Sequence, residues 1–127
     1  MVDIGNSLIK TAVMDGGEAI DVRRYEALDP GAVKAIVGEY PSLERAIVAS
    51  TGQSTAHAAE LLRSAGLRVL EMSHSTAVPI GNDYLTPETL GADRIAAAVG
   101  VWAMYGDGDV LIVDFGTAIT IDYVEGG

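Results

Sequence analysis

Two stretches of this chain follow the same pattern, and they constrain its fold more than any other feature. Residues 2–10 (VDIGNSLIK) and 111–120 (LIVDFGTAIT) each carry apolar residues, an Asp, one apolar residue, a Gly, a small polar residue and further β-forming residues. This pattern predicts a strand, a tight turn at the Gly and a second strand. Because Gly lacks a Cβ, such a turn lets a ligand approach the backbone N–H groups.

The Asp of each stretch ends its first strand, so its carboxylate points at whatever the turn binds. An ordinary β-hairpin with a Gly turn explains either stretch taken alone. The repetition of the Asp-x-Gly pattern favours a functional interpretation, in which two hairpins bind the phosphates of a nucleotide. A cation between the Asp carboxylate and the phosphate makes that arrangement electrostatically sound.

The charge balance argues against nucleic acid as a partner. The chain has 127 residues with 18 acidic and 8 basic side chains, which gives a net charge of −10. Proteins that grip nucleic-acid phosphates are normally basic, and the adjacent pair Arg23-Arg24 is too small to form a basic patch. The chain has no Cys, which excludes disulfides and thiolate metal sites, and His57 and His74 lack the spacing of metal ligands.

We also expect no membrane partner. The N-terminus lacks a basic region followed by an apolar run, which argues against a signal peptide. The longest apolar run, residues 95–105, is too short to span a bilayer and indicates a buried helix. Because 49% of the residues are hydrophobic, the chain can bury a core. These observations predict a cytoplasmic protein.

The order of the predicted elements indicates an α/β fold. Three strands form an antiparallel meander, with Asp15-Gly16-Gly17 as a hairpin turn, and Asp29-Pro30 begins the first helix. Strands that alternate with helices predict parallel pairing. The predicted strands are 1–4, 8–14, 19–25, 46–50, 67–72 and the hairpin 110–124. The first predicted helix begins at residues 29–30, and the other two span about 53–64 and 88–105.

This order matches a ribonuclease-H-like (actin-like ATPase) domain, with a mixed sheet, a three-strand meander and flanking helices. A duplicated two-domain protein opens each half with an Asp-x-Gly hairpin. We therefore predict an N-terminal domain over residues 1–106, and the first hairpin of a truncated second domain over residues 107–127.

A third motif, residues 89–94 (TLGADR), lies between the two hairpins and follows Tyr84. With residues 3–10 and 113–122, it resembles the three signature blocks of type III pantothenate kinase, a family of the acetate and sugar kinase, heat-shock ATPase and actin superfamily. The outer blocks alone indicate only the superfamily, whereas the Gly-Ala-Asp-Arg block is specific to the family. The family's chain is about twice as long, so the resemblance covers its N-terminal half and the first hairpin of its C-terminal half.

The resemblance implies an ATP-dependent kinase that converts pantothenate to 4′-phosphopantothenate, the first step of coenzyme A biosynthesis. It also implies Mg²⁺, a monovalent cation (K⁺ or NH₄⁺) and a homodimer. Two alternatives come from other functional classes: a non-catalytic nucleotide-binding scaffold, and an accessory transcriptional regulator. The intact Gly-Ala-Asp-Arg block favours catalysis, because a protein that only binds ATP has no use for an acceptor site.

The resemblance finally assigns roles to residues. Asp93 corresponds to the general base that takes the proton of the pantothenate hydroxyl, and Asp114 to the ligand of the monovalent cation. The implied ATP-binding residues are Asp3, Ile4, Gly5, Asn6, Ser7, Leu8, Ile9, Lys10 and Thr117. The implied pantothenate-binding residues are Tyr84, Gly91, Ala92, Asp93 and Arg94.

Physical chemistry agrees with these roles without requiring them. The guanidinium of Arg94 suits a two-pronged pair with the carboxylate of the substrate. Ser7 stands where the family commonly has Thr, and both offer a hydroxyl. The residues alone leave simpler interpretations open: Asp93 as a first-turn acid, Lys10 as a surface lysine, Asp114 as a turn cap and Tyr84 as a packed loop aromatic.

Overall fold

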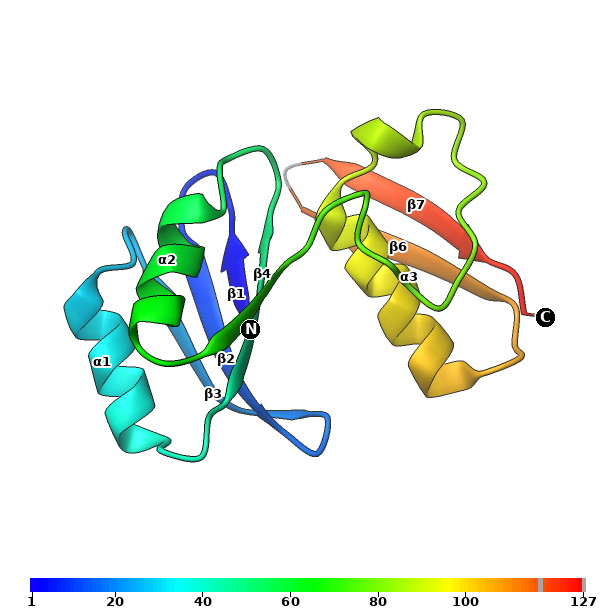
Figure 1. The fold of residues 1–127 in the computed structure, drawn as a ribbon. Helices are drawn as coiled ribbons and strands as arrows, with labels where there is room; N and C mark the ends of the chain where they lie inside the picture. Colours follow the sequence, from blue (N-terminus) through cyan, green and yellow to red (C-terminus); the bar gives the residue numbers. More distant parts are fainter. Residues whose placement is uncertain (117, 127) are drawn as a thin grey trace. The chain divides into compact units, whose positions relative to one another are not determined.

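The computed structural model describes residues 1–116 and 118–126, and the chain divides into two compact units. Unit 1 is Met1–Ser73 and unit 2 is His74–Gly127 (Figure 1). The domain boundary predicted near Gly106 falls inside unit 2, because the helix before it packs on the hairpin after it. The assignment of residues 1–106 and 107–127 to two domains of a longer protein stays a prediction.

Unit 1 contains a five-stranded mixed sheet in the order β3-β2-β1-β4-β5. The meander of β1, β2 and β3 is antiparallel, whereas β4 runs parallel to β1 and β5 runs parallel to β4. The predicted meander and the predicted parallel pairing are therefore confirmed. The strands are β1 (Val2–Ile4), β2 (Ile9–Asp15), β3 (Glu18–Tyr25), β4 (Arg45–Ser50) and β5 (Arg68–Glu71).

Two helices cover one face of this sheet, α1 (Pro30–Glu39) and α2 (Ala56–Ser64) (Figure 1). The start of α1 is as predicted: the Asp29 carboxylate accepts a hydrogen bond from the N–H of Ala32 at 2.8 Å, and Pro30 occupies the first helical position. Helix α2 begins three residues later than predicted, because residues 50–53 form a separate turn.

The core of unit 1 lies between the sheet and these helices. Val2 and Ile4 of β1 and Val48 of β4 point at this side, where they meet Val33 of α1 and Leu62 of α2. Val48 is fully buried. Alternate residues of a strand face opposite sides of a sheet, so the register that buries Val2 and Ile4 turns Asp3 to the other face.

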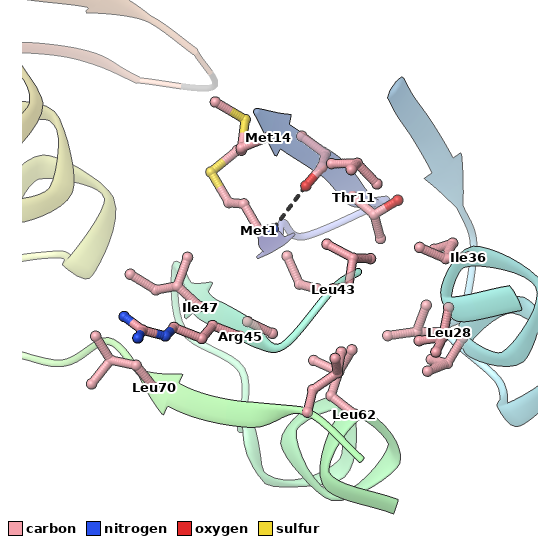
Figure 2. A pocket seen from close by; sticks show the side chains of 17 residues that line it. Met1, Thr11, Met14, Leu28, Ile36, Leu43, Arg45, Ile47, Leu62 and Leu70 are labelled. Carbon is pink, nitrogen blue, oxygen red and sulfur yellow. Dashed lines mark hydrogen bonds between the residues drawn. The ribbon is translucent and has the colours of Figure 1, made fainter. Parts of the chain in front are cut away.

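A mostly apolar cavity of about 360 Å³ opens at the sheet end where β1 and β4 begin. Figure 2 shows its lining side chains, together with the Met1 amine donating a hydrogen bond to the Ala12 carbonyl at 2.8 Å. The Gly turn leaves the other end of β1, so this cavity lies away from the predicted phosphate site. Its lining carries few polar groups beyond those of Thr11 and Arg45, so we assign it to core packing.

Unit 2 contains the 3₁₀ helix η1 (Pro87–Thr89), helix α3 (Ala92–Tyr105) and the hairpin of β6 (Val110–Phe115) and β7 (Ile119–Val124). The continuous helix predicted over residues 88–105 is wrong. Gly91 has an extended backbone (φ −59°, ψ 138°), which ends η1 and starts α3 afresh. The hairpin itself is as predicted, and no third strand joins it among the residues that the structure describes.

The two faces of the β6–β7 hairpin differ. One face carries α3, whose residue Arg94 reaches Asp122 of β7. The other face is an exposed apolar ladder of three cross-strand pairs, with each side chain between 42% and 78% exposed. We call these six residues the apolar ladder: Leu111, Val113, Phe115, Ile119, Ile121 and Tyr123.

These observations establish an α/β protein with a mixed sheet and flanking helices. Within residues 1–116 and 118–126, no helix is long and apolar enough to cross a membrane.

Candidate active site

The first predicted phosphate turn joins β1 to β2 in unit 1. The N–H of Gly5 donates to the carbonyl of Leu8 at 3.1 Å, which closes the turn. A Cβ on Gly5 would lie 3.1 Å from that same carbonyl oxygen, so a side chain at this position would crowd the turn. Asn6 and Ser7 are exposed at its tip, and no backbone hydrogen bond occupies their N–H groups in the described part of the chain. Such N–H groups suit an anion.

A second turn, which the sequence analysis did not assign to the site, supports this one. Ser50 is the last residue of β4, the parallel neighbour of β1, and Gln53 follows three residues later. The Ser50 hydroxyl donates to the carbonyl of Ile4, and the Gln53 amide donates to the carbonyl of Gly5, each at 3.3 Å. The sequence signal was present, because parallel strands end at the same sheet edge and Ser-Thr-Gly follows a buried strand.

The residues of the first turn contribute in different ways. Ile4 is buried in the core of unit 1, so only its backbone is available to a ligand. Asp3 and Lys10 lie directly opposite one another on β1 and β2. Their positions in the strands turn both side chains to the sheet face that α1 and α2 do not cover.

The predicted acceptor motif, residues 91–94, lies at the start of α3 in unit 2. Asp93 is in the first turn, and its Oδ1 accepts a hydrogen bond from the N–H of Arg94 at 2.9 Å. A Cβ on Gly91 would lie only 2.3 Å from the same Oδ1. Gly91 therefore leaves the space in which the Asp93 carboxylate sits. Ala92 is buried, so its side chain contributes to packing.

Arg94 is the centre of a second contact set in unit 2. Its guanidinium forms a two-pronged pair with the Asp122 carboxylate, with Nε 3.0 and 3.1 Å from the two oxygens and Nη2 2.5 Å from Oδ1. Its Cζ lies 5.0 Å from the centre of the Tyr84 ring, within cation–π range. Hydrogen bonding to Asp122 holds the pKa of Arg94 above its usual value, against the opposing effect of burial.

The two-pronged partner of Arg94 in this structure is thus a residue that the sequence analysis did not single out. Asp122 occupies a strand position that faces α3, where an apolar residue is the usual choice. An acidic residue at such a position was the available signal, but its partner could not be read from the sequence.

Asp114, the predicted cation ligand, is exposed near the end of β6, opposite Thr120. The predicted ATP contact Thr117 lies outside the described residues. Within residues 1–116 and 118–126, no three His, Asp or Glu side chains gather as a metal-binding group. In unit 2 of the structure, Tyr84 lies beside Arg94, and Gly91 lies beside Asp93. In unit 1, residues 3–10 form one hairpin.

Comparison with known proteins supports the family that the three sequence motifs indicate. The sequence profile of type III pantothenate kinase matches residues 1–127. A type III pantothenate kinase of Phocaeicola vulgatus is 38% identical over 126 residues, covering 98% of this chain and 51% of the relative. Those of Azobacteroides pseudotrichonymphae and Bacteroides fragilis are 34% and 32% identical over 125 residues, with the same coverage. The chain spans about half the length of the curated relatives it matches.

Proposed function

We propose, from the premise that this chain belongs to the type III pantothenate kinase family, that the protein containing it uses ATP to phosphorylate pantothenate. The product is 4′-phosphopantothenate, and the reaction opens coenzyme A biosynthesis. The observation that carries the proposal is the Asp93 carboxylate, seated over Gly91 at the start of α3.

In this proposal Asp93 is the general base. The hydrogen bond from the N–H of Arg94 engages Oδ1, which leaves Oδ2 to accept the proton of the pantothenate hydroxyl. Phosphoryl transfer depends mainly on positioning and charge stabilisation, so a carboxylate in a fixed orientation is the main requirement on the acceptor side. The helix dipole stabilises an anion at this position.

The turn of residues 5–8 in unit 1 binds the phosphates of ATP through its exposed N–H groups. The hydrogen bonds from Ser50 and Gln53 engage the carbonyls of Ile4 and Gly5, which keeps these oxygens away from a bound anion. Lys10 is exposed on β2 and adds positive charge near the turn. Thr117 belongs to this ATP-binding set by family resemblance alone.

The donor set fits cations that are shared with the nucleotide. Mg²⁺ in kinases is commonly held by one or two carboxylates together with substrate phosphates, so the Asp3 carboxylate beside the first turn fits such an ion without a dedicated cage. We assign the monovalent cation, K⁺ or NH₄⁺, to Asp114. When bound, these ions neutralise charge on the phosphoryl group during its transfer.

Two further assignments belong to the proposal. Residues 1–106 form a ribonuclease-H-like domain, and residues 107–127 begin a second one. The complete protein is a cytoplasmic homodimer. The alternative functions, a nucleotide-binding scaffold or a transcriptional regulator, leave the arrangement of Gly91 and Asp93 without a purpose, so we do not favour them.

The substitution Asp93→Asn tests the proposal. It keeps the size and polarity of the side chain but removes its ability to accept a proton. In the full-length protein, we expect ADP release with pantothenate to fall by about 10²-fold or more, as for other general bases, with ATP binding retained.

A matched control is Asp107→Asn, which removes an exposed carboxylate beyond the other end of α3 and should leave turnover unchanged. Turnover of Asp93→Asn within a few-fold of the unsubstituted protein would overturn the assignment of the base. An unsubstituted protein that binds ATP but releases no ADP with pantothenate would instead support the scaffold.

A further inference from the structure

The pair between Arg94 and Asp122 joins two motifs that the proposed function treats separately. Arg94 belongs to the acceptor motif at the start of α3, whereas Asp122 lies on β7, in the hairpin that carries Asp114. Both side chains are partly buried, with 22% and 19% of their surfaces exposed. All three hydrogen bonds come from Nε and Nη2, so the carboxylate fixes the plane of the guanidinium.

This orientation has two consequences for the acceptor site. The guanidinium is held over the ring of Tyr84, another residue of the predicted pantothenate site, so the pair orders both residues together. The bonds to Asp122 use Nε and Nη2, so Nη1 is not engaged by that carboxylate. Pantothenate carries a carboxylate, which is the group that a fixed guanidinium edge recognises best.

Stability alone gives little reason for this pair. Desolvating two charges offsets most of their attraction, and well-packed apolar residues often stabilise a protein equally well. The neighbouring positions that face α3 on this hairpin include Val110, Ile112 and Val124, which are apolar. An acid among them indicates a requirement on the orientation of Arg94.

We infer that Asp122 is a positioning residue of the acceptor site, which orients Arg94 to receive the carboxylate of pantothenate. The inference rests on the proposed function. Asp122 does not touch the substrate and acts only through Arg94, so its effect belongs in substrate affinity rather than in the chemical step.

The test is Asp122→Asn in the full-length protein, which keeps the side-chain volume and one acceptor oxygen but removes the charge. We expect KM for pantothenate to rise about tenfold, while KM for ATP and kcat change less than about threefold and the melting temperature stays within a few degrees. Asp109→Asn is the matched control, because Asp109 accepts a hydrogen bond from Gly126 in the same hairpin and has no contact with Arg94 among the described residues.

A double substitution separates positioning from simple structural support. Arg94→Met should raise KM for pantothenate, and adding Asp122→Asn should raise it no further, because residues that act as one unit are not additive. If the increases in KM for pantothenate of the two single variants multiply in the double variant, the inference is overturned. A KM for pantothenate in Asp122→Asn equal to that of the unsubstituted protein would also overturn it, as would a fall in melting temperature that accounts for the lost activity.

The same measurements distinguish this inference from the proposed function. If the unsubstituted protein phosphorylates pantothenate and Asp122→Asn behaves like it, only the role of Asp122 is wrong. If the unsubstituted protein does not phosphorylate pantothenate, the proposed function is wrong and the inference falls with it.

Discussion

The two Asp-x-Gly hairpins share a sequence pattern but have different surroundings. In the first, β1 is the central strand of a five-stranded sheet, and Ile4 is 5% exposed. In the second, β6 and β7 pair only with each other among the described residues, and Ile121 is 61% exposed. The pattern therefore specifies a hairpin, whereas burial depends on the elements that surround it.

The turns differ as well. Ile4 pairs with Ile9 across the first turn, and Phe115 pairs with Ile119 across the second, so the first turn is one residue longer. As a result, Asp3 lies opposite Lys10, whereas Asp114 lies opposite Thr120. Asp3 therefore has a cationic residue opposite it in the hairpin, whereas Asp114 has a neutral one. This difference supports the assignment of the monovalent cation to Asp114.

The difference in burial between the two hairpins predicts the largest effect. Ile4→Ala removes a buried side chain and should lower the free energy of unfolding by about 2–5 kcal/mol. Ile121→Ala, the matched change in the exposed apolar ladder, should alter it by only about 0.5 kcal/mol. Urea unfolding of the 127-residue chain followed by circular dichroism measures both. Equal losses in the two variants would show that the hairpins are buried alike in solution.

The difference between the two acids makes the second prediction. In the full-length protein, Asp114→Ala should abolish the rise in activity when K⁺ replaces Na⁺. Asp3→Ala should keep that response and instead raise KM for ATP about tenfold, the factor that corresponds to 1.4 kcal/mol. Steady-state rates in the two salts decide the matter. Equal activity of the unsubstituted protein in K⁺ and Na⁺ would contradict the cation assignment.

The apolar ladder makes the third prediction. A two-stranded hairpin is marginal in water, and its free edges and apolar surface favour association. We expect the isolated 127-residue chain to associate through this hairpin and to lack kinase activity. Size-exclusion chromatography with light scattering should show that Ile121→Lys reduces the association, while Ile20→Lys on β3 does not. A monomer with an ordered hairpin, or robust phosphorylation by this chain, would refute it.

The smallest effect concerns acid stability in unit 1. Hydrogen bonds from Thr55 and Arg63 lower the pKa of Glu71 below its usual value near 4.5. A depressed folded pKa stabilises the fold above the unfolded pKa, and this contribution is lost as the pH falls through the folded pKa. Glu71→Gln should thus be slightly less stable at pH 7, and the difference should shrink as the pH falls below about 4.5 and vanish only below the folded pKa. Glu60→Gln on the exposed side of α2 is the control in thermal melts.

Local features of the fold were predictable because short-range chemistry decides them. Asp29-Pro30 begins α1 by capping and a fixed φ, and Gly16 and Gly17 form the β2–β3 turn with positive φ values. The continuous helix predicted over residues 88–105 is wrong because the backbone is extended at Gly91, which the apolar, Ala-rich composition of the segment does not reveal.

Candidate site residues could be assigned one by one from the sequence and their roles stay predictions, but their contacts could not be predicted. The resemblance identified Tyr84, Asp93 and Arg94, and these lie in one unit. Asp122 was not identified, since a pair 28 residues apart depends on how β7 packs on α3. Ser50 and Gln53 were not identified either, because their carbonyl partners become neighbours only when β4 pairs with β1.

The parallel pairing of β1 with β4 also has a consequence for folding. Val2 lies opposite Val48, and the Ser50 hydroxyl reaches a carbonyl 46 residues earlier in the chain. During synthesis, β1 leaves the ribosome before its parallel neighbour β4, which emerges only after β2, β3 and α1. Closing such a long loop carries an entropic penalty, and non-local pairing slows folding. The meander can form early as nascent chain, but the turn of residues 5–8 acquires its full support only once β4 has been translated.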